Sequence, residues 1–338
     1  MNTLKQLKEK ISDVNFHQLY PGFKQYTFAL YNQDSVFFEE ATIPWTTDFI
    51  GNTSIKYKGE QIAIWDLHYK IDDLDVFASK IVHEMFHAHQ LTLGETRFPD
   101  ELKGLDYRYT KESISLLFHE TKRLIEAVKH QKKEVFQDYL SLRKYRKSLY
   151  PMNVGYEDKI ALVEGSARFV ELMALRQLND DTYQRSLEET FAYLSDPKNY
   201  LSIRKTSYDI GALVLVYCKE HAVFLDWSIK GKVETYFDLL LRDVKVLVPD
   251  EEALKLDTDF LDAYKKKEKI LIQEIIDQPR EVIKGDKLVG FDPMNLVKTD
   301  GYYRSSHMIK ILKGQEEVTI LGHSVFEYKE GGVIVYKS

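Results

Sequence analysis

Residues 81–90 read Ile81-Val82-His83-Glu84-Met85-Phe86-His87-Ala88-His89-Gln90, and they contain the pattern His-Glu-x-x-His. An acidic start at Asp72, apolar residues at helical spacing and a stop at Gly94 predict one helix across this stretch. Residues four apart lie on the same face of a helix, so His83 and His87 can bind one metal ion. Zinc–nitrogen bonds of ~2.0–2.1 Å suit that spacing.

Glu84 and His89 have different expected roles beside this pair. Glu84 lies about 100° around the helix from His83, where its carboxylate can take a proton from a water bound to zinc. Zinc lowers the pKa of such a water towards ~7, which makes Glu84 the expected general base. His89 lies about 200° around the helix from His87 and cannot share the ion, so we expect it to be structural or exposed.

A catalytic zinc site needs a third protein ligand, because it has three such ligands and one open position for water. The motif has no His-x-x-His-x-x-Gly-x-x-His continuation, which argues against the metzincin arrangement. The third ligand must therefore come from another segment. The candidates are acidic residues of the helical region that follows: Glu112, Glu120, Glu126, Glu157, Glu164 and Glu171.

Glu164 is the favoured candidate because of its neighbours. It lies in an otherwise apolar turn, and the small residues 165–167 allow this helix to approach the first one closely. A carboxylate on such a packed face needs a partner, which a metal provides. A salt bridge from Glu164 to Arg168 is the alternative. Glu171, two turns further on, is expected to accept a hydrogen bond from a ligating histidine or to form an ordinary salt bridge.

The His-Glu-x-x-His motif with a downstream Glu-Gly-x-Ala helix resembles the gluzincin group of metallopeptidases, over about residues 50–215. The resemblance implies an edge strand beside the motif helix, a zinc ion held by His83, His87 and Glu164, and cleavage of amide bonds by activated water. The interval from His87 to Glu164 is much longer than in the thermolysin-like and aminopeptidase branches. The subfamily and the substrate therefore stay open.

Hydrolysis also develops negative charge on the carbonyl oxygen, which a phenol, imidazole or guanidinium can stabilise. Tyr208 belongs to a Tyr-x-x-Gly pattern similar to that of gluzincin relatives, and we select it for this role. Packing is an equally good explanation for one of 22 tyrosines. His68 and Arg204 are the substitutes.

The predicted fold class is α+β, with a mainly helical, zincin-like domain over residues 1–278 and a small β-rich module over 281–338. Residues 25–67 are rich in strand-forming residues and predict a small sheet beside the motif helix, with a hairpin of 53–57 and 61–65. Residues 72–278 are predicted to be helical. After the motif helix, periodicity indicates helices at 111–150, 157–178, 182–194, 202–220, 233–247 and 251–276. The expected C-terminal strands are 307–312, 317–321 and 333–336.

Composition limits the classes of binding partner and of cellular location. The net charge of −6 provides no attraction to nucleic acid or to anionic membranes, and neither is expected as a partner. Cys218 is the single cysteine, so no intrachain disulfide can form. Together with an N-terminus that lacks a signal-peptide pattern, this predicts a cytoplasmic protein. The oligomeric state stays open.

The function expected from these residues is that of a zinc-dependent hydrolase with one Zn²⁺ per chain. A metallopeptidase that acts on a peptide or protein substrate is the leading hypothesis. The same site serves a zinc hydrolase or amidase of a non-peptide substrate equally well. The third hypothesis is a metal-binding regulatory protein without turnover, against which the intact Glu84 argues. Co, Mn or Fe can occupy such a site in place of zinc.

Overall fold

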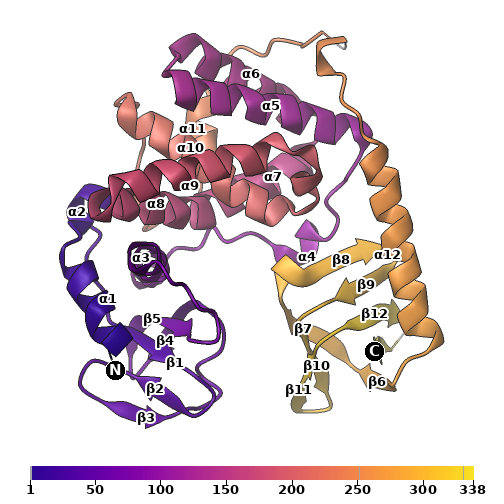
Figure 1. The fold of residues 1–338 in the computed structure, drawn as a ribbon. Coiled ribbons are helices and arrows are strands. Elements are labelled where there is room, and N and C mark those ends of the chain that lie inside the picture. Colours follow the sequence, from indigo (N-terminus) through magenta and orange to yellow (C-terminus); the bar gives the residue numbers. More distant parts are fainter. Residues whose placement is uncertain (1, 251, 330) are drawn as a thin grey trace.

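The chain folds into a helical body with a small sheet at one end and a β module at the other (Figure 1). The computed structural model describes residues 2–250, 252–329 and 331–338. Helices account for about 51% and strands for about 19%, which confirms the mixed α+β composition expected from the sequence.

The N-terminal part consists of two helices and a five-stranded sheet with the strand order β3-β2-β1-β5-β4. Strands β1 and β5 are parallel, and the other neighbours are antiparallel. The predicted hairpin is confirmed as β4 and β5, joined by Lys58 and Gly59 with φ of 48° and 91°, as a tight hairpin turn requires. The elements are α1 (Asn2–Ser12), α2 (Phe16–Leu19), β1 (Phe28–Tyr31), β2 (Ser35–Phe37), β3 (Thr42–Pro44), β4 (Thr53–Tyr57) and β5 (Glu60–Asp66).

The motif helix is α3 (Leu74–Thr92), and both predicted ends are close to the observed ones. The Asp73 side chain caps its first turn by accepting hydrogen bonds from the backbone N–H groups of Asp75 and Val76. Gly94, with φ of 74°, follows its last turn. Helix α3 lies between the sheet and helix α8 (Ser166–Leu178), and for this reason most of its circumference is buried.

The helical body contains the remaining helices of the predicted 72–278 region. The helix that was predicted from residue 157 begins earlier, at Pro151, as α7. A π-helical turn, η1, connects α7 to α8. The elements are α4 (Glu101–Gly104), α5 (Lys111–His130), α6 (Lys133–Leu149), α7 (Pro151–Ile160), η1 (Ala161–Gly165), α9 (Asp180–Ser195), η2 (Pro197–Leu201), α10 (Ile203–Glu220), α11 (Tyr236–Leu241), η3 (Glu252–Leu254) and α12 (Asp259–Asp277).

Three more predicted helices have wrong boundaries. The segment 111–150 is two helices, because Gln131 adopts the left-handed conformation with φ of 53° and ends α5. The segment 233–247 contains only the short α11, since Val246, Leu247 and Val248 are exposed and offer no apolar face to bury. In the segment 251–276, the long α-helix begins only at Asp259, the first residue of α12. Just before it, Asp257 accepts a hydrogen bond from the Asp259 backbone N–H.

The C-terminal module contains the three predicted strands as β10, β11 and β13, together with strands that the sequence analysis missed. Its two sheets have the orders β11-β10-β7 and β6-β13-β12-β9-β8 around a hydrophobic core of its own. The elements are β6 (Glu281–Gly285), β7 (Lys287–Phe291), η4 (Pro293–Asn295), β8 (Leu296–Thr299), β9 (Tyr302–Ser305), β10 (Met308–Lys313), β11 (Glu316–Leu321), β12 (Ser324–Lys329) and β13 (Gly332–Lys337).

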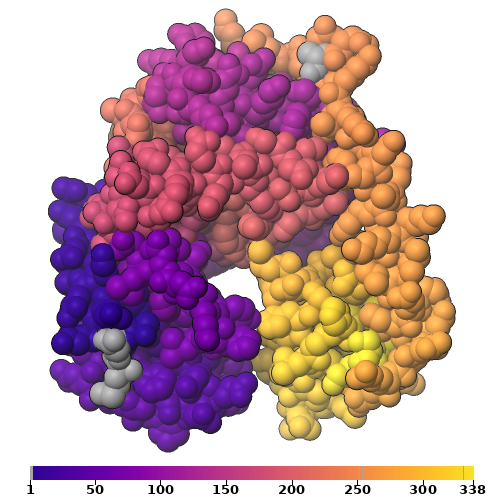
Figure 2. All heavy atoms as spheres, viewed as in Figure 1, coloured from indigo at the N-terminus to yellow at the C-terminus, as the bar shows by residue number. Residues whose placement is uncertain are grey.

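Helix α12 runs from the body along this module and packs on β8, β12 and β13. The Arg304 guanidinium on β9 donates to both Glu268 oxygens on α12, at 2.7 and 2.9 Å, which fastens the helix to the sheet. The predicted boundary at 278–281 falls between α12 and β6, and the division into two domains stays a prediction. Figure 2 shows the molecule hollowed between the N-terminal part and this module. In the described ranges, no helix is long and apolar enough to cross a bilayer.

Candidate metal centre

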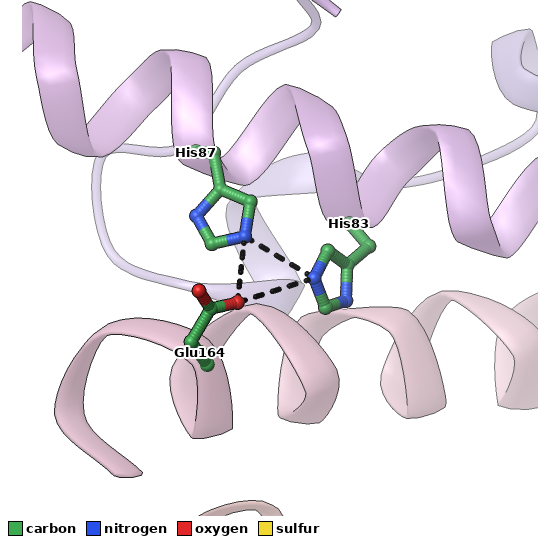
Figure 3. Close-up of side chains that lie close together, drawn as sticks. All are labelled: His83, His87 and Glu164. Atoms are coloured by element: carbon green, nitrogen blue, oxygen red, sulfur yellow. Dashed lines mark hydrogen bonds and ion pairs between the residues drawn. The ribbon is translucent and has the colours of Figure 1, made fainter. Parts of the chain in front are cut away.

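Two helical segments that are far apart in the sequence bring three metal-binding side chains together (Figure 3). His83 and His87 project from α3, and Glu164 projects from η1, which faces it. The Nε2 atoms of the two histidines are 3.2 Å apart. Glu164 Oε2 lies 3.2 Å from Nε2 of His87 and 4.0 Å from Nε2 of His83.

These spacings fit a tetrahedral metal site. Ligand atoms placed tetrahedrally at about 2.0–2.1 Å from zinc lie roughly 3.3–3.4 Å from one another. The two 3.2 Å separations are close to that value, and the 4.0 Å separation needs only a small side-chain rotation. Two imidazoles and one carboxylate are also the donor set that a catalytic zinc ion uses. The donor set and its geometry therefore fit the expected metal.

Each histidine is oriented by a hydrogen bond to its other ring nitrogen. Nδ1 of His83 lies 3.0 Å from Oε2 of Glu171, and Nδ1 of His87 lies 2.8 Å from Oε1 of Gln90. Gln90 is itself fixed, because its Nε2 donates to the carbonyl oxygen of Val163 at 2.9 Å. An acceptor at Nδ1 favours the neutral tautomer that carries its proton there, and in this tautomer each Nε2 can bind a metal.

Glu164 is positioned by the π-helical turn and by one arginine. The Arg204 guanidinium donates from Nη2 to Oε1 of Glu164 at 2.8 Å, which leaves Oε2 directed at the histidines. The alternative partner considered from the sequence, Arg168, pairs with Glu171 and Asp209 instead. The small residues after Glu164 were expected to bring their helix close to the motif helix. Helix α8, which begins at Ser166, does pack on α3, whereas the η1 turn itself packs on α10.

The electrostatics of the cluster favour a bound cation. Burial lowers the pKa of His87, but the Glu164 carboxylate outweighs burial and raises it to about 9. Burial raises the pKa of Glu164, yet His87 and Arg204 hold it at about 2. Positive charge is thus stabilised where the three donor atoms meet, and a metal ion that binds there displaces a proton from His87.

Glu84 lies next to the cluster and lines the same cavity as His83. Its side chain is buried, and burial raises its pKa above the ordinary value although His83 and His87 oppose the shift. A carboxylate with a raised pKa is better matched to proton transfer near neutral pH. The position and the environment of Glu84 therefore suit a general base.

A cavity of about 470 Å³ opens beside the cluster. Its walls come from the N-terminal sheet, α3, α8, α9 and α10, so the motif helix and the body enclose it together. The lining residues are Asn52, Trp65, Lys80, His83, Glu84, Arg168, Glu171, Ser186, Glu189, Thr190, Tyr193, Lys205, Tyr208 and Asp209.

Tyr208 is the predicted oxyanion residue, and the structure places it in the cavity wall with His83 and Glu84. Burial and the nearby Glu164 carboxylate raise the pKa of its phenol well above the usual value. The hydroxyl therefore stays protonated and can donate a hydrogen bond. Of the two substitutes, Arg204 binds Glu164, whereas His68 is exposed before α3 and is not among the described residues that line the cavity.

The other acidic candidates have partners elsewhere. Glu120 and Glu157 belong to a buried network with Arg143 and Arg146. The Tyr150 hydroxyl donates to Glu112, and Glu126 pairs with Arg123. None of these four acids is in the His83–His87–Glu164 cluster, as judged from the described part of the chain.

His89 lies on the opposite side of α3 from the cluster, as its position on the helix predicts. Its ring packs among Phe23, Phe86 and Tyr20, and Nδ1 lies 3.3 Å from the Tyr26 hydroxyl. Its role is therefore structural.

Gln90 and the cations around Glu171 were not predicted from the sequence. Gln90 stands three residues after His87, a spacing that places both side chains on one helix face and could have identified it. Lys80 stands three residues before His83 by the same rule, and its Nζ lies 3.3 Å from Oε1 of Glu171. Asp209, which pairs with Arg168, carries no comparable signal because its helix is remote in sequence.

Comparison with known proteins gives no match for this chain among protein-family models, curated proteins or solved structures.

Proposed function

We propose that this protein is a zinc-dependent hydrolase and, within that class, a metallopeptidase with a zincin-like fold. The observation that carries the proposal is the convergence of three ligand atoms from His83, His87 and Glu164 beside the buried carboxylate of Glu84. A purely structural zinc site is closed by four protein ligands, whereas a site of three ligands beside a cavity, which His83 and Glu84 line, suits catalysis.

The chain's own residues have distinct roles in this proposal. A zinc ion held by the three ligands would act as a Lewis acid that makes water acidic enough to lose a proton near neutral pH. Glu84 accepts that proton and returns it to the leaving group. Tyr208 donates a hydrogen bond to the carbonyl oxygen as negative charge develops there. Glu171 and Gln90 hold the two imidazoles in the required tautomer.

A peptide substrate is supported by the sheet next to the site. Strand β4 is an outer strand of this sheet and lies beside α3, and Asn52, which directly precedes it, lines the cavity. An extended peptide can add to an outer strand through main-chain hydrogen bonds, which a small non-peptide substrate does not require. We place the protein in the cytoplasm because its single cysteine, Cys218, is buried and cannot form an intrachain disulfide.

Metal content tests the first part of the proposal. We expect about one zinc per chain by elemental analysis of protein purified without chelator, and loss of that zinc in His83→Ala and in Glu164→Ala. Glu189→Ala, which removes an exposed acid from the same cavity, is the matched control and should retain the metal. A wild-type chain that holds no metal under zinc-replete conditions would refute the proposal.

Turnover tests the second part. We expect Glu84→Gln to retain zinc but to lose about 10²–10⁴-fold in hydrolysis rate, because the variant has the ligands and lacks the base. Wild type and variant are compared on a peptide library with product analysis by mass spectrometry. Cleavage of ester or non-peptide amide substrates alone would assign the protein to the non-peptide hydrolases. A zinc-loaded chain without any turnover would favour a regulatory metal protein.

A further inference from the structure

Arg204 lies between two carboxylates from different parts of the chain. Its Nη2 donates to Oε1 of Glu164 at 2.8 Å, and its Nη1 pairs with Glu101 on α4. The second oxygen of Glu101 accepts a hydrogen bond from the Tyr156 hydroxyl at 2.7 Å. The arginine side chain is 13% exposed, so these contacts are largely shielded from water.

Because Arg204 pairs with two carboxylates, one oxygen of Glu164 remains available to a metal. A guanidinium tends to pair with a carboxylate through two parallel N–H···O bonds, which would engage both oxygens of Glu164. Glu101 holds Nη1 and thereby fixes the orientation of the guanidinium. In this orientation Nη2 alone reaches Glu164, Nε has no hydrogen-bond partner among the described residues, and Oε2 remains directed at His87, 3.2 Å away. Release of Glu101 would allow Arg204 to compete with the metal for Glu164.

Glu101 is in turn held in place by the C-terminal module. The residues of α4 are half-buried or exposed, so this short helix has little core of its own. Directly after it, Leu105 packs against the core of the module, and Asp106 pairs with Lys298 on β8. The module also approaches α10, the helix that carries Arg204, through η4. The contacts therefore run continuously from the module through α4 and Arg204 to Glu164.

We propose that the C-terminal β module controls the metal affinity of the site through α4. When Leu105 and Asp106 are docked on the module, Glu101 holds Arg204 and Glu164 can ligate the metal. When the module moves away, Arg204 takes both oxygens of Glu164 and the metal affinity falls. Glu101 and Arg204 are positioning residues in this scheme. The inference rests on the proposed metal site and deepens it by assigning a regulatory element.

Zinc titration of the full-length chain against a competing chelator tests the scheme without any activity measurement. We expect Glu101→Gln and Leu105→Ser each to weaken zinc binding by at least about fivefold, the lower range of measured site-to-site couplings. The double variant should bind no more weakly than Glu101→Gln alone, because both changes break the same chain of contacts. Wild-type affinity in Leu105→Ser, or additive effects in the double variant, would overturn the proposal.

A charge reversal is the second test, and it is needed if circular dichroism shows that Leu105→Ser does not fold. Zinc affinity has to fall in Lys298→Glu and return when Asp106→Lys is added to it. Lys269→Glu is the matched control, because Lys269 pairs with Asp300 on the same module and not with α4. A loss that the reversed pair does not restore would overturn the proposal. The wild-type titration decides separately whether the metal site itself exists, so failure of the proposed function is distinguished from failure of this inference.

Discussion

Single residues around the metal centre are fixed by partners that are charged or hydrogen-bonded themselves. Glu171, which accepts from His83, is also paired with Arg168 and with Lys80. Burial raises the pKa of Glu171, but Arg168 and Lys80 outweigh burial and hold it well below the usual range. Glu171 is therefore ionised and makes His83 a better electron donor towards a metal.

We expect Glu171→Gln to weaken zinc binding by about 10–100-fold while the three ligands remain in place. The amide can still accept a hydrogen bond from His83 but carries no negative charge, so the variant isolates the electrostatic contribution. Isothermal titration with zinc measures the effect. Glu189→Gln, an exposed acid in the wall of the same cavity, should bind zinc like wild type. Equal affinities in the two variants would show that Glu171 is not coupled to the site.

At the scale of secondary structure elements, Glu164 is positioned by the close contact of η1 with α10. A Cβ atom on Gly165 would lie 2.8 Å from Cα of Gly211, and one on Gly211 would lie 2.8 Å from both Cβ and the carbonyl oxygen of Ala161. The Tyr236 hydroxyl also donates to this carbonyl at 3.0 Å. The π-helical turn is thus held from two sides, and its placement directs Glu164, the proposed third ligand, at the histidines.

We expect Gly211→Ala to destabilise the fold by about 1–3 kcal/mol through overpacking against η1, and to weaken zinc binding because Glu164 shifts. Chemical denaturation and zinc titration measure the two effects. Gly155→Ala on α7 is the control, because a Cβ atom there meets nothing within 4 Å. That substitution should stabilise the helix by about 0.5–1 kcal/mol. A Gly211→Ala variant as stable as wild type would contradict the packing argument.

A second feature at this scale is the buried network of ion pairs that joins α5, α6 and α7. Arg143 and Arg146 are fully buried, and both contact Glu120, at 2.6 and 2.7 Å. Arg143 also binds Asp158 at 2.6 Å, and Arg146 binds Glu157 at 2.5 Å. Burial raises the pKa of Glu157, but Arg146 and Arg143 outweigh burial and hold it below the usual value.

A carboxyl group with a depressed folded-state pKa stabilises the protein above its unfolded pKa of about 4.3 and loses this effect as the pH falls. We therefore expect Glu157→Gln to cost about 3–5 kcal/mol at pH 7, because it leaves a buried arginine unbalanced. The difference from wild type should shrink as the pH falls below about 4, as measured by urea denaturation at several pH values. Glu126→Gln, in the exposed pair with Arg123, should change stability by no more than about 0.5 kcal/mol. A pH-independent difference would contradict this assignment.

At the scale of the whole molecule, the candidate metal centre lies where parts of the chain meet that come together only on folding. The two histidines lie on a helix that packs on the N-terminal sheet, and Glu164 belongs to the helical body. The C-terminal module reaches the same site through α4. A metal held by all three ligands therefore stabilises the folded arrangement and has no equivalent in the unfolded chain.

We expect zinc to raise the thermal unfolding temperature, because a ligand at 100 times its Kd stabilises the folded state by about 2.7 kcal/mol. A chelator should reverse the shift. Differential scanning calorimetry of wild type, His83→Ala and Glu164→Ala measures it, and neither variant should respond to zinc. A shift of the same size in these variants would place the stabilising ion elsewhere.

Local patterns in the sequence were sufficient to predict several features of the structure. The His83–His87 pair, the ends of α3 and the β4–β5 hairpin depend on residues a few positions apart, whose geometry a helix or a tight turn determines. The choice of Glu164 used local cues as well, namely small neighbours and a resemblance, and the structure brings it to the two histidines. The predicted length of the helix at α11 was wrong because exposed apolar residues limit it, and local periodicity does not report burial. The predicted start of α12 was wrong because Asp257 accepts a hydrogen bond from the Asp259 backbone.

The sequence by itself determined which atoms are available to a metal and on which helix face they lie, because helical spacing is a local property. Only the tertiary structure decided which of six acids meets the histidines, since that depends on the packing of η1 against α10 and of α8 against α3. It also decided that Arg204 is shared between Glu164 and Glu101 and that the C-terminal module docks beside α4. These contacts join residues that are distant in the chain, and their formation depends on the free energy of the whole fold.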